Sequence, residues 1–76
     1  MKTFLKLLSY SDVHGPEKKT NMATHCKMSY TRFIPILNVM MAFEFLEIKE
    51  NSVKVSITQL GKKILLKLQN DSDNIN

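Results

Sequence analysis

The feature that most constrains the fold is a change of hydrophobic period across residues 46–57. Leu46 and Ile48 alternate with charged residues, and the second half of the segment alternates in the same way. Because successive side chains of a strand point to opposite faces, this segment predicts a β-hairpin with one buried face. A two-residue loop at its centre places Leu46 opposite Ile57 and Ile48 opposite Val55. The apolar pairs then share one face, and a slip of one residue would separate them.

The same register sets two lysines side by side on the outer face of the hairpin. Lys49 and Lys54 flank the turn at Asn51-Ser52. Like charges directly opposite one another destabilise a hairpin mildly, so the pair is more favourable with an anion beside both ammonium groups. The alternative is that both side chains extend into water.

Helical periodicity marks the chain on both sides of the hairpin. Residues 2–10 carry an apolar stripe, residues 20–26 form a short helix with Thr20 as its expected N-cap, and residues 29–43 form a third helix capped by Ser29. Pro35 lies inside the third segment, which predicts that the helix starts late or is kinked there. After the hairpin, Thr58 caps a last helix that carries the apolar stripe Leu60, Ile64 and Leu68.

The predicted order is therefore helix, helix, helix, strand, strand, helix. This order is typical of a mainly α domain with a small β-hairpin (α+β), arranged as a helix-turn-helix with a wing. We expect one domain over residues 1–69, followed by a polar and disordered tail over residues 70–76.

The charge of the chain is concentrated in the predicted domain. The whole sequence has a net charge of +4, whereas residues 1–69 carry 11 basic and 5 acidic side chains, a net charge of +6. This excess favours a polyanionic partner, either nucleic acid or an anionic membrane surface. Lys6 interrupts the first apolar run, so a signal peptide is not expected, and residues 33–43 are too few to span a bilayer. We expect a soluble cytoplasmic protein.

Residues that often carry chemistry do not form a recognisable site. The one cysteine, Cys26, excludes an internal disulfide, and its neighbour His25 points about 100° away on a helix, which suits no common metal ion. Glu44, Glu47 and Glu50 recur every three residues across a helix–strand junction and form no defined acid–base pair. The sequence therefore predicts no enzyme, metal, cofactor or small-molecule ligand.

Three motifs carry a resemblance to a known family. They are Lys18-Lys19-Thr20-Asn21-Met22, Met28-Ser29-Tyr30, and Ile57-Thr58-Gln59-Leu60-Gly61-Lys62. With these motifs the chain resembles the archaeal winged-helix transcriptional regulators over roughly residues 4–68. The sequence departs from that pattern at Lys27 in the turn, at Pro35 in the third helix, and at Glu44, where the family usually has glycine.

The resemblance implies binding of double-stranded DNA by a regulator or a small nucleoid-associated protein. In such domains the third helix enters the major groove, where the fork of Arg32 suits a guanine edge or a pair of phosphates. The other expected contacts lie on the second helix, the turn, the third helix and the wing. The full predicted set is Lys18, Lys19, Thr20, Lys27, Ser29, Tyr30, Thr31, Arg32, Asn38, Lys49, Asn51, Ser52 and Lys54.

A chain of 76 residues has a small core, so association with a second copy is expected. The first and last helices have broad apolar faces, and we predict a homodimer formed through Phe4, Leu5, Leu8, Leu65, Leu66 and Leu68. The alternative function is a winged-helix protein–protein interaction module, in which the third helix docks a partner protein without direct DNA contact.

Overall fold

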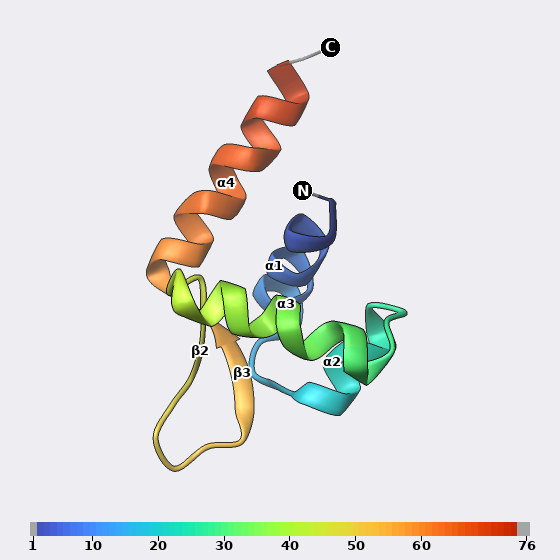
Figure 1. Cartoon of the computed structure of the whole chain (residues 1–76). Coiled ribbons are helices and arrows are strands. Elements are labelled where there is room, and N and C mark those ends of the chain that lie inside the picture. Colours follow the sequence, from blue (N-terminus) through green and yellow to red (C-terminus); the bar gives the residue numbers. More distant parts are fainter. Residues whose placement is uncertain (1, 75–76) are drawn as a thin grey trace.

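The computed structural model describes residues 2–74, which form four helices around a small antiparallel sheet (Figure 1). The elements are α1 (Lys2–His14), β1 (Glu17–Lys18), α2 (Lys19–His25), α3 (Tyr30–Ala42), β2 (Leu46–Ile48), β3 (Lys54–Ile57) and α4 (Gln59–Asn74). The predicted α+β fold is confirmed, and the sheet gains one strand that the sequence analysis did not predict.

The sheet has the order β1-β3-β2, and the predicted hairpin register is confirmed. Leu46 lies opposite Ile57 and Ile48 opposite Val55. The connection is longer than the predicted two residues, because β2 ends at Ile48 and β3 begins at Lys54. The predicted pairing of Lys49 with Lys54 is therefore not part of the β2–β3 ladder. A turn forms instead, closed by the Ser52 amide on the Lys49 carbonyl at 3.0 Å, with Asn51 in the left-handed region at φ 67°.

The unpredicted strand, β1, occupies the other side of β3. Glu17 lies opposite Val55 and Lys18 opposite Lys54. Lys18 is also the N-cap of α2, and its side chain makes no cap hydrogen bond. The prediction of Thr20 as the cap was therefore wrong, because pairing with β3 places the N-cap two residues earlier. α1 also continues four residues beyond the predicted end, to His14.

The core lies where all four helices meet one face of the sheet. Its buried side chains are Leu7, Leu8, Met22, Ala23, Cys26, Phe33, Leu37, Met40, Leu46, Val55 and Leu65. Burial of each large apolar side chain contributes about 1.5–3 kcal/mol, so these residues supply most of the driving force for folding.

α3 runs from Tyr30 to Ala42 through Pro35. It starts at the residue after Ser29, earlier than the late start considered from the sequence. Phe33, Leu37 and Met40 point into the core, whereas Pro35 is exposed, so the missing amide of the proline lies on the solvent side.

A compact junction joins the end of α3 to the start of α4. Thr58 caps α4 as predicted, accepting the Gly61 amide on Oγ1 at 2.9 Å. The same hydroxyl donates to the Glu44 carbonyl, and the Thr58 amide donates to the Phe45 carbonyl at 3.1 Å. Glu44 turns the chain with a φ of 63°. This junction fixes α4 against the beginning of β2.

The last helix is longer than predicted. α4 continues to Asn74, so residues 70–74 of the expected disordered tail are helical, while residues 75–76 lie outside the described residues. The α4 helix packs beside α1 within the same chain. The predicted boundary at residue 69 therefore does not coincide with the end of a secondary-structure element.

Candidate nucleic-acid interface

The outer face of α3 carries the predicted base-reading residues. Ser29, Tyr30, Thr31 and Arg32 are all exposed at its N-terminal end, and Asn38 is exposed one helical turn and a half further along. The other exposed residues of this face are Pro35, Val39 and Ala42. The face therefore offers one guanidinium, one amide and several hydroxyls, separated by apolar side chains.

The turn between α2 and α3 sets the angle at which this face is presented. Lys27 adopts a left-handed conformation with a φ of 58°. Its amide donates to the Thr24 carbonyl at 3.0 Å, and the next amide, of Met28, donates to the Ala23 carbonyl at 2.9 Å. The Lys27 side chain is exposed at this turn, immediately before the start of α3.

A second group of basic residues forms where β1 and α2 meet the wing, the loop of residues 49–53. Lys18 and Lys54 lie opposite one another on adjacent antiparallel strands. Next to them is a pocket of about 370 Å³ lined by Lys18, Lys19, Thr20, Ile48, Ser52 and Val53. The structure thus brings four predicted contact residues together around one hollow, with Lys54 beside it.

The remaining predicted wing residues, Lys49 and Asn51, are exposed on the loop itself. The wing extends beyond the helices, away from the free ends of α1 and α4 (Figure 1). Val53 is 69% exposed there. The rest of the domain therefore does not block this loop from a binding partner that α3 and β1 also contact.

A polar cluster that the sequence analysis missed holds β1 and α2 against α1. The Tyr10 hydroxyl donates to Glu17 Oε2 at 3.2 Å and lies 2.6 Å from His25 Nδ1. Because a hydroxyl has one hydrogen, His25 Nδ1 is then the donor to Tyr10. The ring of His14 stacks on Tyr10 with centroids 4.2 Å apart. Only Tyr10 and His14 share a helical spacing, four residues apart on α1, whereas the contacts with Glu17 and His25 depend on the fold and on the unpredicted strand β1.

Hydrogen bonds set the ionisation of Glu17 within this cluster. Its Oε1 accepts the Asn21 side-chain amide at 3.2 Å and the Lys18 backbone amide at 3.3 Å. These bonds, that of Asn21 above all, favour the carboxylate and lower the pKa of Glu17. The pKa of Tyr10 is raised by desolvation and by the neighbouring carboxylate.

Cys26 faces the core from the end of α2 and is 2% exposed. Burial raises the pKa of its thiol, so the side chain is a packing element in this fold. Among the residues that the structure describes, no three histidine, cysteine or acidic side chains are arranged to hold a metal ion.

The six residues predicted for the dimer interface are divided by the fold. Leu8 and Leu65 are buried in the core of the single chain, so they are not available to a second one. Phe4, Leu5 and Leu68 are half-buried. Leu66 is 61% exposed on the outer side of α4. Leu8 and Leu65 are buried because α1 packs against α4 within one chain.

The order of elements, the tight turn before α3 and the three-stranded sheet with its projecting loop define a winged helix-turn-helix domain. The chain belongs to the Winged helix-turn-helix family, whose sequence model matches residues 2–75. Domains of this family typically bind DNA and are usually non-catalytic. No curated protein and no solved structure gives a match to the chain. Within residues 2–74, every helix is too short or too polar to cross a bilayer.

Proposed function

We propose that this protein binds double-stranded DNA through α3 and the wing, as a transcriptional regulator or a small nucleoid-associated protein of the cytoplasm. In this proposal α3 lies in the major groove, with residues 29–32 nearest the bases. The lysines of β1, α2 and the wing contact phosphates on either side.

The observation that carries the proposal is the pair Lys18 and Lys54. Two ammonium groups on directly opposed residues of neighbouring strands repel one another in the free protein. Lys19 adds a third positive charge at the adjacent pocket, which is also lined by the Ser52 hydroxyl of the wing. A phosphate placed here would relieve the repulsion and accept hydrogen bonds from several donors.

The composition of the outer face of α3 favours modest sequence discrimination. Arg32 and Asn38 are the side chains of this face best suited to bidentate contacts with a guanine or an adenine edge. The exposed Pro35 and Val39 can make only apolar contacts. Most of the affinity would then come from phosphates, as expected for a protein with a net charge of +4.

The test is a titration of a fluorescent duplex at two salt concentrations. Binding driven by phosphate contacts weakens steeply as salt rises, because the release of counterions from the duplex favours the complex less at a higher salt concentration. We expect a fall in affinity of at least about tenfold between 50 and 200 mM salt for a few phosphate contacts. An affinity that does not change with salt would contradict the proposal and favour the protein–protein interaction module.

We also propose that the protein acts as a homodimer, assembled through the apolar residues that the fold leaves accessible on α1 and α4. Leu66 is the most exposed of these, and half-buried Phe4, Leu5 and Leu68 lie on the same pair of helices. Light scattering at micromolar concentration should give twice the chain mass, and Leu66→Lys should give the mass of one chain. A single-chain mass for the wild type would contradict the dimer and leave DNA binding to be judged by its own titration.

A further inference from the structure

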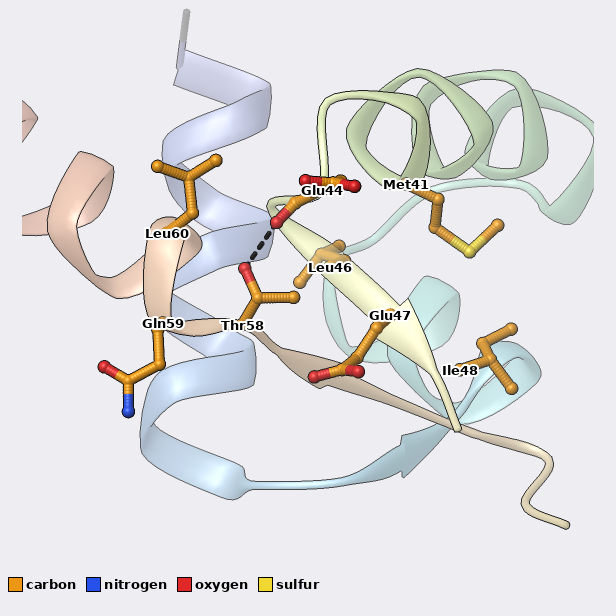
Figure 2. A pocket seen from close by; sticks show the side chains of 8 residues that line it. All are labelled: Met41, Glu44, Leu46, Glu47, Ile48, Thr58, Gln59 and Leu60. Atoms are coloured by element: carbon orange, nitrogen blue, oxygen red, sulfur yellow. Dashed lines mark hydrogen bonds between the residues drawn. The ribbon is translucent and has the colours of Figure 1, made fainter. Parts of the chain in front are cut away.

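A groove distinct from the basic face lies over β2, between the end of α3 and the start of α4. It has a volume of about 480 Å³, within the range of binding pockets, and its lining residues are Met41, Glu44, Leu46, Glu47, Ile48, Thr58, Gln59 and Leu60 (Figure 2). Leu60, one of these lining residues, is 41% exposed and offers the groove an accessible apolar surface. Ile48 is the one residue that lines both this groove and the pocket beside Lys18 and Lys19.

The strand that runs along this groove is an edge strand. β2 pairs with β3 on one side only, since the sheet order is β1-β3-β2. The Phe45 carbonyl accepts the Thr58 amide, so residue 45 directs its backbone groups towards β3, and so does Glu47 two residues on. The N–H and C=O groups of Leu46 and Ile48 therefore point away from the sheet, as the edge of an incomplete ladder does.

The charge of the groove is opposite to that of the rest of the protein. Glu44 lines it from the turn before β2 and Glu47 from the middle of the strand, and its lining includes no lysine, arginine or histidine. The chain as a whole carries 11 basic residues against 7 acidic ones. This patch therefore repels nucleic acid and attracts positively charged groups.

We propose that this groove binds an extended segment of a partner protein in which basic and apolar side chains alternate. The segment adds a strand to β2 through the outward backbone groups of Leu46 and Ile48, in the manner of peptides that extend a sheet edge. Its basic side chains pair with Glu44 and Glu47, and its apolar side chains contact Met41, Ile48 and Leu60. The proposal does not depend on DNA binding, because none of the residues proposed to contact DNA lines the groove.

The experiment is a fluorescence anisotropy titration of the full chain with labelled hexapeptides at low salt. The first peptide alternates arginine with valine, and the second alternates glutamate with valine. We expect saturable binding of the arginine peptide and none of the glutamate peptide. Equal binding of both peptides, or no binding of the arginine peptide at millimolar protein, would overturn the proposal.

Paired variants separate the groove from the general charge of the protein. Glu44→Gln/Glu47→Gln should weaken the arginine peptide about fivefold, the sum of two exposed ion pairs. Asp12→Asn/Glu50→Gln changes the net charge equally at exposed carboxylates outside the groove, and it should leave the affinity within twofold. Equal losses in both double variants would show non-specific attraction and overturn the assignment.

The strand addition has its own readout. Methylation of alternate backbone nitrogens in the arginine peptide removes the donors needed for a ladder and should reduce its affinity at least tenfold in one of the two methylation registers. Bound peptide should also slow amide hydrogen exchange at Leu46 and Ile48. Full affinity of both methylated peptides would overturn the proposed binding mode, whatever the outcome of the DNA titration.

Discussion

Gly61→Ala tests the junction that fixes α4 to the sheet. A Cβ atom at residue 61 would lie 2.1 Å from the Phe45 carbonyl oxygen and 2.8 Å from Ile57 Cγ1. The first atom belongs to the backbone and cannot rotate away, so α4 must move by about 1 Å to reach an ordinary contact distance. Such a shift strains the bond from the Gly61 amide to Thr58 Oγ1.

The expected loss of stability follows from three opposing contributions. Overpacking costs about 1–3 kcal/mol, and each weakened hydrogen bond at the junction costs about 1 kcal/mol. Alanine in a helix is favoured over glycine by about 1 kcal/mol. With the Gly61–Thr58 bond as the one weakened, the net destabilisation is about 1–3 kcal/mol, a large share of the roughly 4–11 kcal/mol expected for a chain of 76 residues.

The assay is urea denaturation followed by circular dichroism, with Gly15→Ala as the matched control. A Cβ at residue 15 meets no atom within 4 Å, but the backbone has a φ of 74°, so this variant should lose only about 1 kcal/mol. A Gly61→Ala protein as stable as the wild type would refute the reasoning. It would show that the close approach of residue 61 to Phe45 does not exist in solution.

Three further predictions concern single positions. Glu44→Gly should raise the free energy of unfolding by about 0.5–1 kcal/mol in the same assay, because Glu44 holds a φ of 63° that glycine adopts without strain; a loss would contradict this. Arg32→Ala should cost about 1–3 kcal/mol of binding at a preferred DNA site and less on random duplex, and equal losses would make it a phosphate contact. The lowered pKa of Glu17 means that its contribution to stability is complete above the unfolded-state pKa and is lost as the pH falls through the folded-state value. Glu17→Gln should therefore unfold less steeply with acid than the wild type, and an unchanged pH dependence would argue against the cluster.

The hairpin was predictable because the positions of its apolar residues determine the register of the two strands. Only one alignment brings Leu46, Ile48, Val55 and Ile57 to the same face, and the structure has that alignment. The length of the connection was not predictable in the same way. It depends on a local turn in which Asn51 is left-handed. The conformational cost of such a turn and the hydrogen bond that it gains are of similar size, so the residue types do not determine the length of the connection.

Strand β1 could not be predicted because a strand of two residues is too short to show an alternation of apolar and polar side chains. Its formation depends on the free side of β3, which is a property of the folded chain. This omission had consequences for the candidate site. The sequence analysis paired Lys54 with Lys49, whereas the fold pairs it with Lys18.

The outward face of α3 was correctly inferred, because burial of Phe33, Leu37 and Met40 fixes the opposite side of a regular helix. The apolar faces of the terminal helices were harder to interpret. A wide stripe predicts contact with another element but does not say whether that element belongs to the same chain. Leu8 and Leu65 are covered by the chain itself, and Leu66 is not.

The most direct test of the proposed DNA surface compares two lysine pairs by the slope of log affinity against log salt. Lys18→Ala/Lys54→Ala removes the opposed pair, while Lys62→Ala/Lys63→Ala removes the same charge from the exposed side of α4. If the opposed pair contacts phosphates, its removal should flatten the slope by about 2 units on every duplex sequence, and the α4 pair should leave the slope nearly unchanged. Equal slopes for both variants and the wild type would contradict the account and remove the opposed pair of β1 and β3 from the binding surface.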